Sequence, residues 1–228
     1  MKVILFGATG MVGSGVLIEC LADPRVTSVV SVVRRTGGTA HPKLVEVAHR
    51  DFFDFASLRA SFEGAGACFF CLGVSSFRLD EDEYRRLTYD LTLAAARAVL
   101  DAAPRTVFCY VSGEGTDSTG RGRVMWARVK GQTEQALLAM PFRAGYMFRP
   151  GYIQPLQGVR SKTALYQTAY NILAPLYPLL QRVAPTHVTT SVNVGRAMIE
   201  VAVHGYPRPL LENEDINRAA GGTAGQGS

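Results

Sequence analysis

Short apolar runs alternate with longer, more polar stretches along residues 2–148. The runs are apolar at consecutive positions rather than at every second one, a pattern typical of strands buried on both faces of a parallel sheet. They predict strands over 2–6, 28–33, 44–47, 67–72, 106–111 and 144–148. The intervening stretches predict helices over 11–22, 56–63, 80–103 and 124–139, and a later stretch predicts a helix over 191–203.

Strands that alternate with helices build βαβ units, in which the strands are parallel and helices cover both faces. We therefore expect an α/β fold with a Rossmann-type doubly wound parallel sheet over residues 1–155. Residues 156–218, whose segment 160–184 is apolar, aromatic and interrupted by prolines, should form a small C-terminal helical cap within the same structural domain. The cap would cover a substrate cleft or form the contact of a homodimer. Residues 219–228 have little to bury and should be a disordered tail.

The predicted helix over 80–103 carries two local signals. It opens with "DEDE", and acidic residues at that end favour the positive end of the helix dipole. Apolar positions then recur at intervals of three or four residues, which defines one face of a helix. The residues expected to face the sheet are Tyr84, Leu87, Leu91, Ala95, Ala98 and Ala102.

A glycine-rich turn follows the first predicted strand. In "VILFGATGMVGSG", Gly7, Gly10 and Gly13 lead directly from that strand into a helix. Glycines at this spacing permit a tight turn, close approach of backbone to a pyrophosphate, and close packing of helix on strand. The free N–H groups of the helix N-terminus then bind the phosphates. The turn therefore predicts a dinucleotide site.

Two arginines end the second predicted strand. The sequence there reads "VVRRT", so Arg34 and Arg35 stand where an NAD enzyme usually has an acidic residue for the ribose hydroxyls. A guanidinium group binds a phosphate through two parallel hydrogen bonds. The pair favours NADP(H) over NAD(H) as the cofactor.

Composition and charge exclude several other classes of protein. The net charge is +5 and the pI about 9.2, but the basic residues are scattered, so no nucleic-acid tract is expected. The sequence has no uninterrupted apolar run of about 18 residues, so we expect no membrane insertion. The chain starts on a strand-like run without a cationic leader, which indicates a cytoplasmic protein.

A C-x-x-C pair, Cys68 and Cys71, lies in an apolar run that reads as a buried strand. Residues three apart on a strand point to opposite faces, which does not suit a shared metal ion. We expect buried thiols and no metal site.

Three motifs together resemble the atypical short-chain dehydrogenase/reductases. They are "GATGMVG" at the first turn, "VKGQTE" around Lys130 and "RPG" after the sixth strand, and the resemblance covers about residues 1–215. More narrowly, the chain resembles the Tat-interacting-protein-like, epimerase-like branch of NAD(P)-binding proteins. The resemblance implies that the cofactor contacts Gly7, Thr9, Gly10, Met11, Val12, Gly13, Asp51, Phe52, Cys71, Leu72, Gly73, Thr88, Lys130, Pro150, Gly151 and Ile153.

The usual catalytic tyrosine of that family is missing. The family reads Tyr-x-x-x-Lys, whereas this chain reads "WARVK", with Trp126 at the tyrosine position and Lys130 in place. The resemblance implies that Ser112 positions the substrate and that Lys130 binds the nicotinamide ribose. An indole N–H donates a hydrogen bond but does not exchange a proton near neutral pH. Trp126 would then wall the nicotinamide pocket or simply fill the core.

Other groups are candidates for the missing acid. Tyr110 shares a strand face with Ser112, and Tyr152 follows the "RPG" loop, but both are also plausible packing residues. None of the four histidines, at 41, 49, 187 and 204, falls in a recognised catalytic place, and His187 is the best placed of them only because it lies in the predicted cap.

Two functions remain open. The first is an NADP(H)-dependent oxidoreductase that acts on a small carbonyl or hydroxyl substrate with an unusual proton donor or water. The second is an NADPH-binding sensor or partner-binding protein without turnover. A third, a nucleic-acid-associated regulator, rests only on the pI.

Overall fold

The computed structural model describes residues 1–38, 40–155 and 185–221. Within these residues the main sheet has seven parallel strands, in the order β3-β2-β1-β4-β5-β6-β9. The strands are β1 (Lys2–Phe6), β2 (Ser28–Val33), β3 (Leu44–Ala48), β4 (Ala67–Phe70), β5 (Val107–Val111), β6 (Ala144–Arg149) and β9 (Leu210–Glu212). The chain runs outward from β1 to β3 and then returns to β4, so the strand order reverses between β1 and β4. This topology confirms the predicted Rossmann-type sheet.

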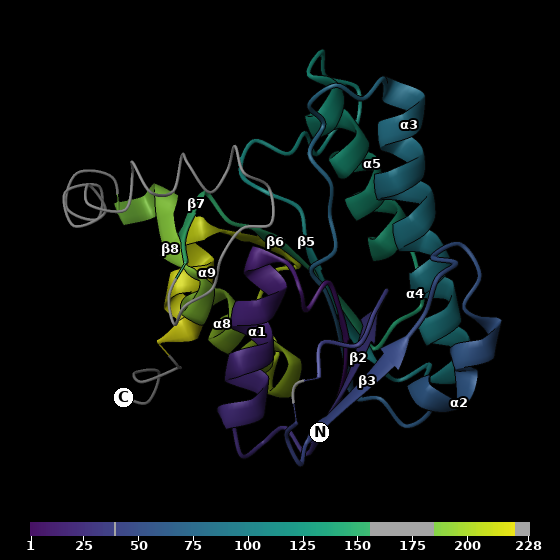
Figure 1. The fold of residues 1–228 in the computed structure, drawn as a ribbon. Coiled ribbons are helices and arrows are strands. Elements are labelled where there is room, and N and C mark those ends of the chain that lie inside the picture. Colours follow the sequence, from purple (N-terminus) through teal and green to yellow (C-terminus); the bar gives the residue numbers. More distant parts are fainter. Residues whose placement is uncertain (39, 156–184, 222–228) are drawn as a thin grey trace.

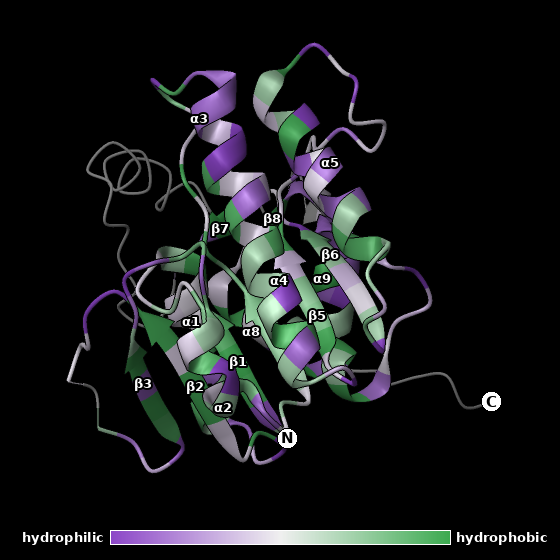
Figure 2. Cartoon of the chain, turned by 90° about the vertical axis from the view of Figure 1, so that its right-hand side faces the viewer, coloured by the Kyte–Doolittle hydropathy of each residue, from purple (hydrophilic) through white to green (hydrophobic). Residues whose placement is uncertain are grey.

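Helices cover both faces of the sheet (Figure 1). One face packs against α1 (Met11–Ala22), α8 (Ser191–His204) and α9 (Asn213–Ala220), and the other against α2 (Arg59–Phe62), α4 (Leu91–Ala102) and α5 (Met125–Leu138). Each face has its own apolar core, and the strands between them are largely hydrophobic (Figure 2). In the described part of the chain, no helix is both long and apolar enough to cross a bilayer.

A π-helical turn interrupts the long helix that precedes β5. The segment consists of α3 (Glu81–Arg85), the π turn Arg86–Asp90, and α4, and Asp80 caps it by accepting from the Glu83 N–H at 2.9 Å. The π turn adds one residue to the helical repeat. Of the six residues predicted to face the sheet, Tyr84, Leu91 and Ala95 are buried, and Ala98 and Ala102 are partly buried against the core on that face. Leu87 is half-buried, and Thr88 beside it is 6% exposed.

The described end of the chain contributes to the main sheet as well as to its periphery. β9 is the seventh strand, and α8 and α9 cover the face that α1 also covers. A separate two-stranded sheet pairs β7 (Tyr152–Gln154) with β8 (Val188–Thr190), just after a short 3-10 turn, η4 (Pro185–His187). The sequence did not predict β9, because three residues are too few for a pattern to stand out. Residues 156–184 of the predicted cap and 222–228 of the predicted tail lie outside the described residues.

Helices α1 and α8 are in close contact because each presents a glycine to the other. A Cβ atom on Gly15 would lie 2.6 Å from the Cβ of Ser191, and one on Gly195 would lie 2.9 Å from Cγ of Glu19. Such separations are shorter than real side chains tolerate, so the helices approach at these points only without side chains.

We predict that Gly15→Ala lowers the free energy of unfolding by about 1–3 kcal/mol. The added methyl group must push the start of α8 away, and this overpacking outweighs the gain of about 1 kcal/mol in helix propensity. Chemical denaturation measures the change. Gly73→Ala is the matched control, because nothing lies within 4 Å of its added Cβ. Equal stability of Gly15→Ala and wild type would contradict the packing described.

Candidate functional site

The turn between β1 and α1 is folded so tightly that it excludes side chains. Gly7 has φ 85°, and a Cβ there would lie 2.7 Å from the backbone of Cys71 and Leu72. A Cβ on Gly13 would lie 2.1 Å from the carbonyl oxygen of Gly7. The Gly10 N–H donates to that same oxygen at 2.9 Å. Glycine is therefore required at positions 7 and 13 by this geometry.

The N-terminus of α1 carries no side-chain cap. Gly10 is its N-cap and has no side chain to accept the first-turn N–H groups, which an α-helix leaves without intrahelical partners. Thr9 beside it is exposed, and Met11 and Val12 are half-buried. The turn therefore offers unpaired donors at the point where the strand order reverses, which suits an anion.

The end of β4 forms one side of this turn. The Cys71 N–H donates to Phe6 O at 3.0 Å, and burial raises the pKa of the Cys71 thiol well above its ordinary value. Cys71 packs against one core and Cys68 belongs to the other, so the two thiols face opposite sides of the sheet. Leu72 is half-buried, and Gly73 is exposed with nothing close to it. Among the described residues, no group of three His, Cys, Asp or Glu side chains is placed to hold a metal ion.

Arg34 and Arg35 are exposed where β2 ends. The adjoining loop is held by Glu46 of β3, whose Oε2 accepts from the N–H groups of Gly37 at 2.8 Å and Gly38 at 3.3 Å. That carboxylate binds backbone, and neither arginine has an ion pair or hydrogen bond within the described part of the chain. Both guanidinium groups are therefore available to an anion.

The next predicted contacts lie in two places. Asp51 is exposed and accepts from the Phe53 N–H at 2.9 Å, while Phe52 is buried with its ring 5.9 Å from that of Phe55, edge to face. Thr88 is 6% exposed in the π turn, and its hydroxyl has no hydrogen-bond partner among the described residues. Single π turns are frequent at functional sites.

The "VKGQTE" motif lies on α5 and holds the loop that follows β5. Lys130 Nζ donates to Ser112 O, and Gln132 Nε2 donates to Gly120 O at 2.9 Å. A Cβ on Gly131 would lie 1.7 Å from Asp117 O, so helix and loop are in direct backbone contact. The motif therefore stabilises the loop after β5, whether or not its residues take part in a reaction.

Asp117 stabilises the same loop from within. Its carboxylate accepts N–H groups from Thr119, Arg121 and Gly122 at 2.6–2.9 Å, as well as the Thr119 hydroxyl at 2.7 Å. These hydrogen bonds, that of the Thr119 side chain first, lower the pKa of Asp117 to about 2. The loop is therefore fixed at both its ends and its middle.

Ser112 takes part in a buried ionic network. Its hydroxyl donates to Glu134 Oε1 at 2.5 Å, and Arg149 Nε donates to the same oxygen at 3.0 Å. Arg149 also donates to Glu212 at 3.0 Å and Ser118 at 2.7 Å. The side chains of Arg149 and Glu134 are 7% and 2% exposed. The Ser112 hydroxyl also lies 3.1 Å from Phe148 O, so both acceptors available to its single proton belong to the protein.

Lys130 and Trp126 lie next to the two glycines of the loop. A Cβ on Gly113 would lie 3.8 Å from Lys130 Nζ, and one on Gly115 would lie 3.5 Å from the Trp126 ring. Burial lowers the pKa of Lys130 to about 8, although nearby Glu134 opposes the shift. Trp126 is half-buried, so its ring packs on the loop without being wholly inside the core.

The two tyrosines considered as substitute acids have different surroundings. Tyr110 is 1% exposed in the apolar core, where burial raises its pKa well above the ordinary value. Tyr152 is half-buried in β7, and its hydroxyl donates to Gln154 Oε1 at 3.0 Å. Pro150 and Ile153 beside it are buried. Tyr110 is thus a core residue, cut off from any ligand.

Sequence reasoning missed Glu114. This residue follows β5 between two glycines, and its carboxylate pairs with Nδ1 of His187. A Cβ on Gly151 of the "RPG" motif would lie 2.6 Å from Glu114 Oε2 and 2.2 Å from His187 O. The signal available in the sequence was a carboxylate in "SGEG", directly after a buried strand.

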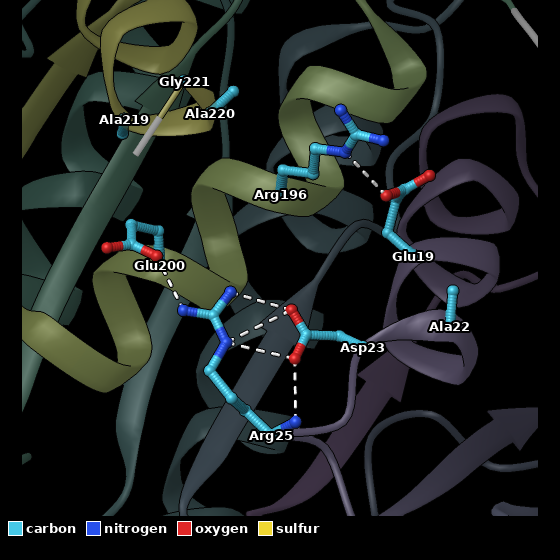
Figure 3. A pocket seen from close by; sticks show the side chains of 9 residues that line it. All are labelled: Glu19, Ala22, Asp23, Arg25, Arg196, Glu200, Ala219, Ala220 and Gly221. Atoms are coloured by element: carbon cyan, nitrogen blue, oxygen red, sulfur yellow. Dashed lines mark hydrogen bonds and ion pairs between the residues drawn. The ribbon is translucent and has the colours of Figure 1, made fainter. Parts of the chain in front are cut away.

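A hollow on another part of the surface does not resemble a ligand site. It lies between the C-terminal ends of α1 and α9 and the helix α8 (Figure 3). Its charges are paired with one another: Arg25 with Asp23 at 2.8 Å and Glu200 at 2.7 Å, and Arg196 with Glu19 at 2.9 Å. These ion pairs leave little charge for a ligand.

No protein-family model matches the chain, but curated relatives do. It is 31% identical over 183 residues to the mitochondrial protein fmp52-1 of Aspergillus terreus, covering 76% of this chain and 74% of that one. It is 32% identical over 159 residues to mitochondrial fmp52 of Emericella nidulans, covering 67% of this chain and 66% of that one. It is 28% identical over 200 residues to mitochondrial fmp52-2 of Aspergillus oryzae, covering 87% and 85%.

The names of these relatives correct the predicted location. All three are described as mitochondrial, which contradicts a cytoplasmic protein. The prediction was wrong because it rested on the strand-like start of the sequence, and the first residues of a chain do not by themselves fix its compartment.

Solved structures share the fold at low sequence identity. An oxidoreductase of the short-chain dehydrogenase/reductase family from Burkholderia thailandensis has a TM-score of 0.67 at 15% identity, covering 94% of this chain and 92% of that one. A UDP-N-acetylglucosamine 4-epimerase from Methanobrevibacter ruminantium has a TM-score of 0.67 at 14% identity, covering 92% and 75%. The Bordetella bronchiseptica enzyme WbmH in complex with NAD+ has a TM-score of 0.60 at 14% identity, covering 89% and 72%. The chain therefore has the fold of NAD-binding dehydrogenases and epimerases.

We predict that Glu134→Ala lowers the free energy of unfolding by ~2–5 kcal/mol, because it leaves the buried Arg149 guanidinium without its main partner. Chemical denaturation measures the loss. Glu214→Ala removes the exposed ion pair with Arg218, whose side chains are 62% and 61% exposed, and should cost less than about 1 kcal/mol. Similar losses in the two variants would show that the buried network does not stabilise the fold.

We predict a pH-dependent effect of Lys130→Met on stability. The pKa of Lys130 is lowered from 10.5 to about 8 on folding, so between these values the unfolded state binds more protons. The penalty for burying the ammonium group is full below pH 8 and disappears as the pH rises toward 10.5. The stability of Lys130→Met minus that of wild type should therefore fall by up to ~1 kcal/mol per pH unit across this window. A difference that stays constant from pH 7 to pH 10 would be inconsistent with a lowered pKa.

Proposed function

We propose that this chain, which belongs to the family of the fungal Fmp52 proteins, is an NADP(H)-dependent oxidoreductase for a small carbonyl or hydroxyl substrate. The observation that carries the proposal is the turn at Gly7 and Gly13, where backbone contacts leave no room for a Cβ atom. This turn lies where the strand order reverses, which is where doubly wound sheets bind dinucleotides. The shared fold with NAD-binding dehydrogenases and epimerases supports it.

The residues around the turn fit the parts of the cofactor. The N–H groups of Met11, Val12 and Gly13 suit the pyrophosphate, with Thr9 and Gly10 beside it. Arg34 and Arg35, which have no ion pair in the described residues, suit the 2′-phosphate of NADP(H). The remaining proposed contacts are Asp51 and Phe52 at the adenine, Cys71, Leu72, Gly73 and Thr88 near the adenosine ribose, Lys130 at the nicotinamide ribose, and Pro150, Gly151 and Ile153 beside the nicotinamide.

The chemistry divides between cofactor and chain. NADP(H) supplies or accepts the hydride, while the chain must orient the substrate and move a proton at its oxygen. Trp126 is not an acid, and the Ser112 hydroxyl donates to Glu134. Lys130 would bind the ribose, as its place next to Gly113 permits. The proton must therefore come from water or from a group other than the usual tyrosine.

A second function, NADPH binding without turnover, is favoured by Trp126 and Ser112. With Trp126 at the tyrosine position and Ser112 held in a buried network, two groups of the usual mechanism are not available. Such a protein would act as a sensor or bind a partner. NADPH oxidation in the presence of a panel of aldehydes and ketones separates the two functions: turnover supports the oxidoreductase, and binding without turnover supports the sensor.

The finer assignments are proposals that follow from the same resemblance. We assign the chain to the Tat-interacting-protein-like branch, with a dinucleotide-binding unit over 1–155 and a cap over 156–218. We further propose a mitochondrial location, in line with the names of the fungal relatives, and a homodimer.

We predict that wild type binds NADPH at least about tenfold more tightly than NADH, because a charge-assisted hydrogen bond to the 2′-phosphate is worth about 1.5–3 kcal/mol. Arg34→Asp should remove most of this preference, and Arg35→Asp part of it. Fluorescence titration with both cofactors measures the affinities. The control for net charge is Arg105→Asp. Arg105 is exposed just before β5 begins, at the amino-terminal end of the strands, whereas Arg34 follows the carboxyl-terminal end of β2. Equal affinities of wild type for NADPH and NADH would exclude the proposed preference.

A further inference from the structure

We propose that His187, oriented by Glu114, exchanges the proton with the substrate oxygen in place of the missing tyrosine. The inference rests on the proposed oxidoreductase function. In this role His187 is the catalytic residue, since it would touch the substrate, and Glu114 is a positioning residue.

Glu114 lies next to the positions of the family's tyrosine and lysine. It follows β5 and lies in the chain between Gly113 and Gly115. A Cβ atom built on Gly113 would lie 3.8 Å from Lys130 Nζ. One built on Gly115 would lie 3.5 Å from the Trp126 ring. Glu114 is therefore bracketed by the two residues that occupy the positions of the family's tyrosine and lysine. A group held by Glu114 is near the place where the usual acid would act.

Glu114 and His187 both contact the "RPG" motif. The Glu114 N–H donates to Pro150 O at 2.9 Å, and a Cβ on Gly151 would lie 2.6 Å from Glu114 Oε2 and 2.2 Å from His187 O. The loops after β5 and β6 thus meet the η4 turn at Gly151. The imidazole is therefore held beside Gly151, which is one of the residues proposed above to border the nicotinamide.

Helix α9 fixes the backbone that carries His187. The Asn213 side chain accepts from the Gly151 N–H at 3.0 Å and donates to Val188 O at 2.9 Å, and Asn217 donates to the same oxygen at 2.8 Å. Asn213 is 3% exposed. The residue next to His187 is thereby tied to both α9 and the "RPG" loop, so the imidazole starts from a fixed backbone.

The hydrogen bond to Glu114 determines what the imidazole can do. A carboxylate at Nδ1 holds the proton on that nitrogen and directs Nε2 outward, as in other carboxylate–histidine pairs. The His187 side chain is 62% exposed and that of Glu114 is 41% exposed, so a substrate can reach both. No other partner of the imidazole is found among the described residues.

Other charged groups near η4 are already paired. Helix α9 packs against η4 and carries Glu214, Asp215 and Arg218. Arg218 pairs with Glu214 at 2.8 Å, and the Asp215 carboxylate accepts from Arg208 and from the Tyr206 hydroxyl. Glu114 is the carboxylate that contacts the imidazole directly.

The proposed step balances with NADPH as the reductant. Hydride adds to the carbonyl carbon, the π electron pair of the C=O bond moves to oxygen, and that oxygen takes the proton from Nε2 of the His187 imidazolium. The products are an alcohol, NADP+ and neutral His187, which water reprotonates. In the oxidative direction, neutral His187 accepts the alcohol proton at Nε2.

The test compares His187→Ala with His204→Ala, which removes another exposed histidine, in α8. Both should keep the NADPH affinity of wild type within about twofold by fluorescence titration. With a panel of aldehydes and ketones, kcat should fall by about 10²–10⁴-fold in His187→Ala alone. Added imidazole should restore part of the lost rate. Glu114→Gln should reduce kcat, and Glu114→Asp should recover part of the loss.

Nitrogen-15 NMR of the imidazole gives a readout that does not depend on turnover. Neutral His187 should carry its proton on Nδ1 in wild type and shift toward Nε2 in Glu114→Gln, with the signal assigned by its loss in His187→Ala. Each unfavourable result has its own meaning. Failure to bind NADPH refutes the proposed function itself. Binding without turnover in wild type, full turnover in His187→Ala, or a proton on Nε2 in wild type each overturns the role of His187.

Discussion

The close backbone contact among Gly7, Gly13 and the end of β4 is the constraint on which the rest of the structure depends. A Cβ at either glycine would collide with backbone at 2.1–2.7 Å, so the turn can close only without side chains. Closure sets the start of α1 at the point where the strand order reverses. From there α1 runs along the sheet to meet α8, again through glycines. The glycines of this turn thus position α1 and leave the N–H groups at its N-terminus accessible to a ligand.

A second constraint lies at the end of β5, where α5 and its loop hold each other. Lys130, Gly131 and Gln132 contact successive parts of the loop, and Glu134 binds Ser112 and Arg149. Lys130 and Ser112, which stand at catalytic or cofactor-binding positions of the family, therefore also stabilise this loop. These contacts give Lys130 and Ser112 a role in the fold that does not depend on the missing tyrosine.

The six long strands and the glycine turn could be predicted from the sequence, because continuous apolar runs and a three-glycine spacing are local signals. β9 could not, since its three residues carry no period. The inward face of the helix over 80–103 could largely be predicted as well, but the π turn at 86–90 could not, because no residue pattern in the sequence indicates it. Glu114 and His187 are 73 residues apart, so only the fold reveals that they meet.

Hydrogen exchange with and without NADPH tests the central claim, that the glycine turn is a dinucleotide site, most directly. The account predicts slower exchange on binding in peptides that cover residues 7–14, 34–37 and 71–73. It predicts no change in peptides around Glu200 and Gly221, which line the hollow of Figure 3. Saturating NADPH that leaves the turn unprotected, or protects the hollow instead, would contradict it.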